Sequence, residues 1–305
     1  MEVTLLGTSG TLQVPGRPLT SLHVSVKNKS VLFDCGEGTQ LGFTRLKLGL
    51  KRLSVICLTH YHADHILGLP GLIATINMFL KCGNVGNRDL LIIGPPDTNH
   101  ILRNILNAVQ HPYVRISTYF VSGHGKRVLD FDGFSIEVFP VRHSVPCVGY
   151  NLIEKNPPHI DLEKAISSGV DTKYFTFLQK GLTIDLNGEV KTISDISSGR
   201  AKYYKISYVT DTIYFKELSN YVRGANLAIL EGSSYGKLVS SDSLGAHMSY
   251  ADAATIARHA HVRELWLTHF NPRLTTPMEG LSSIKGIFSN VKCGRFGMNK
   301  CFGGN

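Results

Sequence analysis

A dense cluster of metal-binding side chains, His60-Tyr61-His62-Ala63-Asp64-His65, begins one residue after the apolar run 54–58. That run, Ser-Val-Ile-Cys-Leu, has the composition of a buried strand. His60 and His62 are two residues apart, so an extended chain projects both imidazoles to the same side. Asp64 and His65 come next and can turn to a second, adjacent position. A single metal site on a helix needs histidines at i and i+4, which this segment lacks. The spacing therefore favours two metal ions over one.

Imidazole and carboxylate ligands suit Zn²⁺ first, and Mn²⁺ or Fe²⁺ next. The alternative is a loop on which three histidines occur by chance. A cluster of this density directly after an apolar strand is more typical of a functional site.

The pattern His-x-His-x-Asp-His is similar to the signature of the metallo-β-lactamase superfamily. This resemblance implies further ligands, and the chain supplies them in order as His143, Asp211 and His269, each after an apolar, strand-like run. It also implies how the metals are shared: two Zn²⁺ per chain, one held by three histidines, one held by Asp64 and two histidines, and a carboxylate bridging them. The first set is His60, His62 and His143, the second is Asp64, His65 and His269, and the bridge is Asp211.

Within the superfamily the chain resembles the ribonuclease Z family, endonucleases that trim the 3′ trailer from precursor tRNA. The resemblance rests on residues 6–8, 15–21, 33–40, 68–72, 245–249 and 268–273, and it covers nearly the whole chain. It implies a zinc-dependent endoribonuclease that acts on precursor tRNA and leaves a 3′-hydroxyl, through attack of a hydroxide held by two metals on the phosphodiester. It also implies a homodimer.

The same resemblance suggests roles for three residues. Asp64, besides binding metal, can accept a hydrogen bond from the attacking water and orient it. His247 is the candidate general acid for the leaving 3′-oxygen, because histidine titrates near neutral pH. Glu231 can orient His247. The alternatives are a structural role for His247 and an ordinary strand-end carboxylate for Glu231.

Four residues resemble the family's contacts to substrate phosphates: Arg17, Thr20, Ser21 and Arg273. Guanidinium groups bind phosphate through two parallel hydrogen bonds. The alternative for an isolated arginine is a surface cation or a loop anchor.

Short apolar runs typical of strands recur at 3–6, 22–26, 31–33, 54–58, 90–93, 135–139, 205–210, 227–230 and 264–268. Helical patterns lie at 65–81, 99–110, 251–259 and 278–289. This alternation predicts an α/β fold, and the resemblance specifies a four-layer αββα sandwich of the metallo-β-lactamase type. An ordinary open α/β sheet also fits the pattern. Because the metal-binding residues run from His60 to His269, we expect one domain over residues 1–305.

Residues 154–202 interrupt the alternation, since they are polar and rich in turn residues. In ribonuclease Z this position holds a protruding arm that grips the tRNA body. The segment differs from the family pattern at its tip, Gly169-Val170-Asp171-Thr172-Lys173-Tyr174, and its acidic and basic residues balance. We expect a substrate-binding arm here, and a mobile surface loop is the alternative.

The formal net charge of +9 favours a polyanionic partner such as nucleic acid. The six cysteines show no Cys-x-x-Cys pair and indicate reduced thiols in a cytoplasmic protein. The first residues lack the pattern of a signal peptide, and no run reaches the roughly 18 uncharged apolar residues of a membrane helix. We therefore expect no contact with a membrane.

Two other functions fit the metal motif. One is a phosphodiesterase of the same fold that acts on small or cyclic nucleotide substrates, for which residues 154–202 have no evident use. The other is an inactive RNA-binding homologue, against which the complete ligand set argues.

Overall fold

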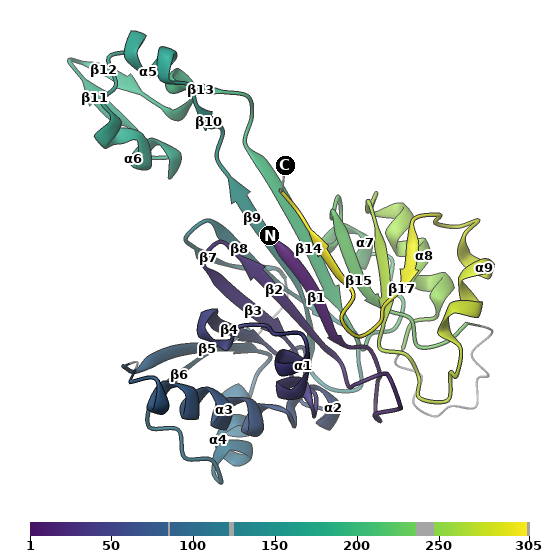
Figure 1. Ribbon diagram of the computed structural model, residues 1–305. Coiled ribbons are helices and arrows are strands. Elements are labelled where there is room, and N and C mark those ends of the chain that lie inside the picture. Colours follow the sequence, from purple (N-terminus) through teal and green to yellow (C-terminus); the bar gives the residue numbers. More distant parts are fainter. Residues whose placement is uncertain (85, 122–124, 236–246, 304–305) are drawn as a thin grey trace. The chain divides into compact units, whose positions relative to one another are not determined.

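The computed structural model describes residues 1–84, 86–121, 125–235 and 247–303, and the chain forms two compact units. The larger unit contains Met1–Leu152 and Lys205–Asn305, and the smaller unit contains Ile153–Tyr204. The chain passes between the units in two neighbouring strands, β9 (Cys147–Asn156) and β14 (Lys202–Val209) (Figure 1). The smaller unit thus begins and ends within two residues of the predicted segment 154–202.

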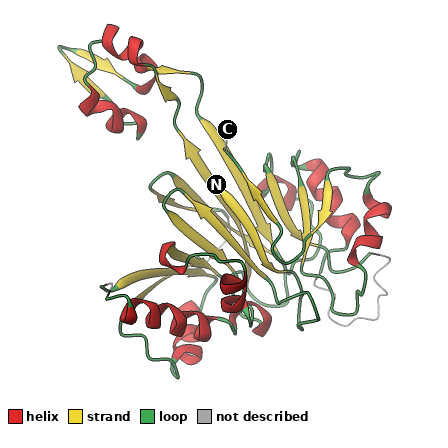
Figure 2. Ribbon diagram, in the orientation of Figure 1, coloured by secondary structure: helices red, strands yellow, loops and turns green. Residues whose placement is uncertain are grey.

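The larger unit contains two seven-stranded sheets (Figure 2). The first has the order β18 (Asn299–Cys301), β1 (Glu2–Gly7), β2 (Ser21–Val26), β3 (Lys29–Phe33), β4 (Leu53–Cys57), β5 (Arg88–Gly94) and β6 (Val114–Phe120). The second has the order β17 (Val291–Cys293), β16 (Leu265–Thr268), β15 (Leu227–Glu231), β14, β9, β8 (Phe134–Val141) and β7 (Arg127–Phe131). Strands β3 to β6 run parallel, as do β14 to β17.

Three apolar layers hold the larger unit together. Side chains of both sheets, including Phe33, Tyr150 and Trp266, pack between the sheets. The helices α1 (Thr39–Arg45), α3 (Leu69–Cys82) and α4 (Thr98–Leu106) cover the outer face of the first sheet. The helices α7 (Leu218–Tyr221), α8 (Tyr250–His259) and α9 (Leu281–Ile284) cover the second. This is the predicted αββα sandwich.

One buried carboxylate connects the edges of both sheets. Glu264 accepts hydrogen bonds from the indole of Trp266 at 2.7 Å, from Lys292 on β17 at 2.8 Å, and from Lys300 on β18. Burial alone would raise the pKa of Glu264, but these hydrogen bonds lower it to about 2. Glu264 is therefore ionised in the folded protein at neutral pH.

The predicted helix 65–81 is wrong in one respect, because the chain forms two helices, α2 (Ala63–Ile66) and α3. They are separated at Gly68, where a Cβ atom would lie 2.2 Å from the backbone oxygen of Gly36. The backbone of Cys35 pairs with both sides of this break, through His65 and Gly68. The close approach of the loop after β3 to the helices therefore sets the boundary. The predicted helix 278–289 is also shorter, and consists of η4 (Pro277–Gly280) and α9.

The segment 63–82 has the length and hydropathy of a membrane-spanning helix, which differs from the prediction that no such run exists. It contains the break at Gly68, and its residues Leu69, Leu72, Ile73 and Ile76 pack into the core under the first sheet. Its apolar character is therefore used inside the protein.

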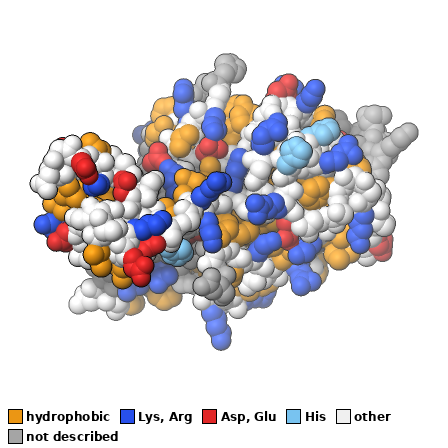
Figure 3. Space-filling model, turned by 90° about the horizontal axis from the view of Figure 1, so that it is seen from above, with side chains coloured by type: hydrophobic (Ala, Val, Ile, Leu, Met, Phe, Trp, Pro, Cys, Tyr) orange, Lys and Arg blue, Asp and Glu red, His pale blue; other side chains and the backbone are white. Residues whose placement is uncertain are grey.

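The smaller unit has a core of its own around Ala165, Val170, Leu178 and Ile196. It contains the helices α5 (Leu162–Ser167), η2 (Thr172–Tyr174), α6 (Phe175–Gln179) and η3 (Ile193–Ile196). Two strand pairs complete it, β10 (His159–Ile160) with β13 (Ser197–Ser198) and β11 (Ile184–Leu186) with β12 (Glu189–Lys191). Seven acidic and seven basic residues balance within it, so the net charge of +9 lies in the larger unit. Among the charged side chains on the face of the larger unit in Figure 3, basic ones are accordingly more frequent than acidic ones.

Candidate metal centre and active site

The predicted metal-binding residues all follow strands of the larger unit. The motif of His60 begins three residues after β4, and His143 follows β8. Asp211, Glu231 and His269 stand at or just after the ends of the parallel strands β14, β15 and β16. Loops at the carboxyl ends of parallel strands meet at one edge of a sheet, which is where α/β proteins place their sites. The fold therefore brings distant parts of the sequence together.

The first group of side chains contains His60, His62, His143 and Asp211, each with one ligand atom within 4.8 Å of the others. Nε2 of His60 lies 2.9 Å from Nδ1 of His62, which lies 3.3 Å from Nε2 of His143. Burial and the neighbouring His65 hold the pKa of His60 well below its usual value, so its imidazole is neutral. Neutral imidazole is the form that binds metal.

The second group contains Asp64, His65 and His269. Nε2 of His65 and Nε2 of His269 are 3.2 Å apart, and both lie 3.4 Å from Oδ2 of Asp64. Burial alone would raise the pKa of Asp64, but the two imidazoles hold it well below its usual range. Asp64 is therefore an ionised, negatively charged ligand.

Asp211 belongs to the first group and also touches the second. Its Oδ2 atom is buried, lies 3.1 Å from Nε2 of both His65 and His269, and accepts a hydrogen bond from neither. Burial alone would raise the pKa of Asp211, but the charges of His269 and His65 hold it well below the usual range. An ionised carboxylate oxygen without a proton donor, enclosed by imidazole nitrogens, fits a bound cation. The residues present therefore suit a divalent metal.

Asp34, for which the sequence suggested no role, orients two histidines through their Nδ1 atoms, on the side of each ring away from the cluster. Its Oδ2 lies 2.8 Å from Nδ1 of His65 and accepts a hydrogen bond from the hydroxyl of Tyr208 at 3.0 Å. Its Oδ1 accepts from the backbone N–H of Thr59 at 2.8 Å, and the Thr59 hydroxyl in turn lies 3.0 Å from Nδ1 of His60. With both Nδ1 atoms occupied in this way, the Nε2 lone pairs face the cluster.

Three residues of this network have left-handed backbones: Asp34, Asp211 and His269, with φ of 53°, 54° and 55°. Residues other than glycine seldom adopt this conformation, although aspartate and histidine do so more often than most, and it recurs at functional sites. Each of the three ends or follows a strand, so the sharp turn redirects its side chain towards the cluster. Gly10 packs against this arrangement, since a Cβ atom there would lie 2.6 Å from the ring of His269.

Glu231 and His247 form a pair beside the metal-binding residues. Oε2 of Glu231 lies 2.9 Å from Nδ1 of His247, and Oε1 accepts the backbone N–H groups of Thr212 at 2.6 Å and Met248 at 3.1 Å. Glu231, His247, Asp211 and His269 lie close enough together to hold an ion. Both carboxylate oxygens of Glu231, however, already accept hydrogen bonds from other groups of the protein. The geometry suits a carboxylate that positions His247. Gly245 and Ala246 of the same motif lie outside the described residues.

His247 has 29% of its side chain exposed, whereas the side chain of Glu231 is fully buried. Burial alone would lower the pKa of His247, but the hydrogen bond to Glu231 and the charges of Glu231, Asp211 and Asp64 raise it to about 9. The metal-free protein therefore carries a protonated imidazole that a substrate can reach.

The predicted phosphate contacts divide into two kinds. Arg17 lies beside the loop that follows His269, since its Nη2 atom is 3.4 Å from the backbone oxygen of Pro272. Arg273 is exposed. The hydroxyls of Thr20 and Ser21 are buried and donate to the backbone oxygens of Ser9 and Asp34, at 3.0 Å and 2.9 Å. The structure does not support these two as phosphate contacts, because enclosed hydroxyls that already donate to the backbone do not meet a substrate.

Comparison with known proteins identifies the family. The model of the metallo-β-lactamase superfamily matches residues 16–78. Ribonuclease Z of Clostridium novyi is 35% identical over 303 residues, which is 95% of each chain. Ribonuclease Z of Clostridium tetani is 35% identical over 307 residues, which is 97% of this chain and 96% of the relative. The chain belongs to the ribonuclease Z family.

Solved structures show that the chain shares its fold with several proteins. Human tRNase Z, short form, superimposes with a TM-score of 0.69 at 21% identity and 99% coverage of each chain. The metallo-β-lactamase fold protein YhfI of Bacillus subtilis superimposes with a TM-score of 0.69 at 18% identity and 98% coverage of each chain. The predicted family and the predicted metallo-β-lactamase fold are both confirmed, and the chain is a metal-dependent ribonuclease rather than an inactive homologue.

Proposed function

We propose that this ribonuclease cuts precursor tRNA endonucleolytically at the 3′ end of the tRNA body, releases the trailer, and leaves a 3′-hydroxyl. The full-length similarity to ribonuclease Z, together with a complete and buried set of metal-binding side chains, carries this proposal. The positive charge of the larger unit suits a polyanionic substrate.

We propose two Zn²⁺ per chain, in the arrangement that the family pattern implies. His60, His62 and His143 would hold one ion, Asp64, His65 and His269 would hold the other, and Asp211 would serve both. Seven imidazole and carboxylate ligands exceed what one four-coordinate zinc can use, which supports two ions. When bound, the ions supply Lewis acidity that lowers the pKa of water and neutralises charge developing on the phosphodiester.

Asp64 orients the attacking water in this proposal. The contacts that Asp64 makes within the described chain all use Oδ2, including a 2.6 Å hydrogen bond from the backbone N–H of Thr11. Oδ1 therefore remains to accept a hydrogen bond from the water. This hydrogen bond turns the lone pair of the water oxygen towards the phosphorus.

His247 gives its proton to the leaving ribose 3′-oxygen. Glu231 binds Nδ1 of the ring, so the proton on Nε2 is the one available to the substrate. Glu231 also stabilises the positive ring before transfer, since its Oε2 lies 2.9 Å from Nδ1. Arg17 and Arg273 are proposed to hold the phosphates that flank the cut.

One experiment tests the function and its main alternative. Purified protein loaded with zinc is incubated in parallel with a precursor tRNA and with bis(p-nitrophenyl) phosphate, and the RNA ends are mapped. We expect a single cut at the 3′ side of the tRNA body with a 3′-hydroxyl. Hydrolysis of the small ester with no cleavage of the precursor would instead indicate a phosphodiesterase for small substrates.

The smaller unit, Ile153–Tyr204, is proposed to hold the body of the tRNA. It folds around its own core, which suits an inserted binding module better than a loose loop. Because its charges balance, its contribution rests on individual cations, Lys155, Lys164, Lys173 and Lys180, rather than on a net positive field.

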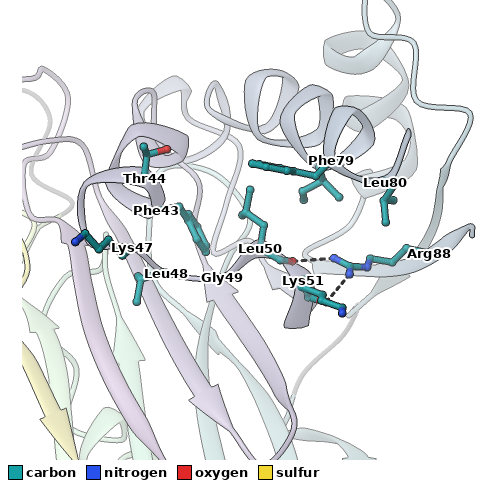
Figure 4. Close-up of a pocket in the computed structure, with 11 residues that line it drawn as sticks. Phe43, Thr44, Lys47, Leu48, Gly49, Leu50, Lys51, Phe79, Leu80 and Arg88 are labelled. Atoms are coloured by element: carbon teal, nitrogen blue, oxygen red, sulfur yellow. Dashed lines mark hydrogen bonds between the residues drawn. The ribbon is translucent and has the colours of Figure 1, made fainter. Parts of the chain in front are cut away.

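We propose that the chain forms a homodimer through the surface around α3. Two large side chains on α3, Met78 and Phe79, are 65% and 64% exposed. Phe79 also lines an apolar cavity of about 480 Å³, whose other walls include Leu48, Leu50 and Leu80 (Figure 4). Arg88 fixes one wall by donating hydrogen bonds to the backbone oxygens of Leu50 and Lys51. In a two-fold dimer, Phe79 of each subunit can fill the cavity of the other.

Light scattering tests the dimer. We expect a dimer for the unaltered chain at micromolar concentration, and a monomer for Phe79→Glu, whereas Val128→Glu on β7, where Val128 is 50% exposed, should remain dimeric. A monomeric unaltered chain, or a dimeric Phe79→Glu, would show that this surface has another use.

We place the enzyme in the cytoplasm. All six cysteines are free thiols, and four of them are buried, as is usual for a protein in a reducing compartment.

A further inference from the structure

A second cavity lies beside the loop that covers the metal-binding residues. It has a volume of about 370 Å³, within the range of small-ligand pockets. Its walls come from the loop 13–18, from α1, and from Phe296. They are mainly apolar, and include Val14, Pro15 and Leu41. The roles proposed above do not use this cavity.

The loop connects the cavity to the centre of the chemistry. Gly10 packs against His269, and the backbone N–H of Thr11 donates to Oδ2 of Asp64 at 2.6 Å. Gln13 is the first residue of the loop to line the cavity, and two residues of extended chain reach at most about 7 Å. The cavity therefore begins close to Asp64, which the proposed function places at the scissile phosphate.

A tight turn separates the two sites. Val14 and Arg17 pair through both backbone N–H groups, with Pro15 and Gly16 between them. Gly16 has φ of 77°, the conformation that a type II turn with proline at its second position requires. Arg17 contacts Pro272 in the loop that follows His269, while Pro15, Gly16 and Pro18 line the cavity. An RNA strand that passes Arg17 therefore meets the cavity next.

The charge around the cavity suits this strand. Arg45 lines it, one helical turn after Leu41 on the same face of α1, and its described walls contain no acidic side chain. Over residues 38–88 the chain has six basic residues and a single acidic one, Asp64. Neither Arg45 nor Lys47 forms an ion pair with the described residues. An apolar wall that includes an aromatic ring, here Phe296, together with a cation is a combination that binds an unpaired nucleotide through its base and its phosphate.

We propose that this cavity is a subsite for one unpaired nucleotide of the RNA that flanks the scissile phosphate. The base lies against Leu41 and Phe296, and Arg45 binds the adjoining phosphate. This inference rests on the proposed action on RNA. It adds a second contact, outside the metal centre, that aligns the RNA strand for cleavage.

A double-mutant cycle tests the subsite. Leu41, 48% exposed, is changed to Glu, and Val128→Glu serves as the control of matched exposure. Each variant is given precursor tRNAs with an abasic site at one of the unpaired positions on either side of the cut. We expect Leu41→Glu to lose about tenfold in kcat/KM, mainly through KM. Removing the base that occupies the cavity should cost the unaltered enzyme a similar factor and cost Leu41→Glu little more. Hydrolysis of bis(p-nitrophenyl) phosphate should be unchanged in both variants.

Additive losses at every abasic position, or equal behaviour of the two Glu variants, would overturn the subsite while leaving the proposed function intact. Binding of a short single-stranded RNA, measured by fluorescence anisotropy, distinguishes failure of the subsite from failure of the proposed function. If precursor tRNA is not cut but Leu41→Glu still weakens RNA binding about tenfold relative to Val128→Glu, the proposed function fails and the subsite stands. If RNA binding is also equal in the two variants, both proposals fail.

Discussion

Oδ2 of Asp34 lies 2.8 Å from Nδ1 of His65, and both side chains are completely buried. The carboxylate fixes the imidazole so that Nε2 faces the metal-binding cluster, and it reaches His60 through the hydroxyl of Thr59. One residue therefore orients histidines of both proposed metal positions. Asp34 follows β3 and lies outside the motif that predicts the site.

Asp34→Asn should lower metal affinity or activity by about 10- to 100-fold, the usual cost of losing a group that orients a metal-binding histidine. An amide cannot accept hydrogen bonds from His65, Thr59 and Tyr208 in the same way. Metal content after dialysis against graded chelator concentrations measures the effect. Asp89→Asn, at an exposed ion pair with Arg115, is the control and should retain its metal. Equal metal content in both variants would remove Asp34 from this role.

His247→Ala should keep its metal and bind precursor tRNA almost normally, yet lose about 10²–10⁴ in cleavage rate, the usual contribution of a positioned acid or base. A nitrophenolate leaves without a proton, so the loss on bis(p-nitrophenyl) phosphate should be small. Single-turnover rates on both substrates, with metal analysis, check this. The same large loss on both, or loss of metal, would make His247 a structural residue.

Removal of residues 154–202, with a short linker in their place, should weaken cleavage of precursor tRNA far more than hydrolysis of the small ester. The small ester needs the metal centre alone, whereas a folded tRNA needs contacts further away. Initial rates on the two substrates, at several salt concentrations, measure the difference. Unchanged tRNA processing would show that the smaller unit does not bind the substrate.

Glu264→Gln should destabilise the fold by about 1–3 kcal/mol at pH 7, because it removes charged hydrogen bonds to Lys292 and Lys300. The folded-state pKa of about 2 lies below the unfolded value of about 4.3. The stabilisation is thus complete above the unfolded pKa and is lost as the pH falls towards 2. Urea unfolding of both proteins between pH 7 and pH 3 should show the two free energies converging. A difference in unfolding free energy that stays constant with pH would show that Glu264→Gln acts through packing rather than through charge.

The sequence predicted the sheets where strands are continuous apolar runs, as in β4 and β15. It did not predict β6, where Arg115, Ser117 and Thr118 are mixed with apolar residues, or β9, where Gly149 and Asn151 interrupt the apolar run. The boundary between α2 and α3 depends on contact with Gly36, which local periodicity does not contain. Likewise the inward positions of Thr20 and Ser21 depend on backbone partners 11 and 13 residues away, in other loops. The metal motif was recognisable because its residue types are dense and local. Asp34 was missed because a lone aspartate after a strand carries no signal of its partners.

The neighbouring strands β9 and β14 have a consequence for how such an enzyme can change. The smaller unit leaves and rejoins the fold at adjacent strands of one sheet, whose ladder of hydrogen bonds holds the two ends together. A shorter turn, or a different module, can take its place without moving a metal-binding residue. The unit proposed to bind the tRNA body can therefore be replaced, in evolution or by protein engineering, while the metal-binding residues stay unchanged.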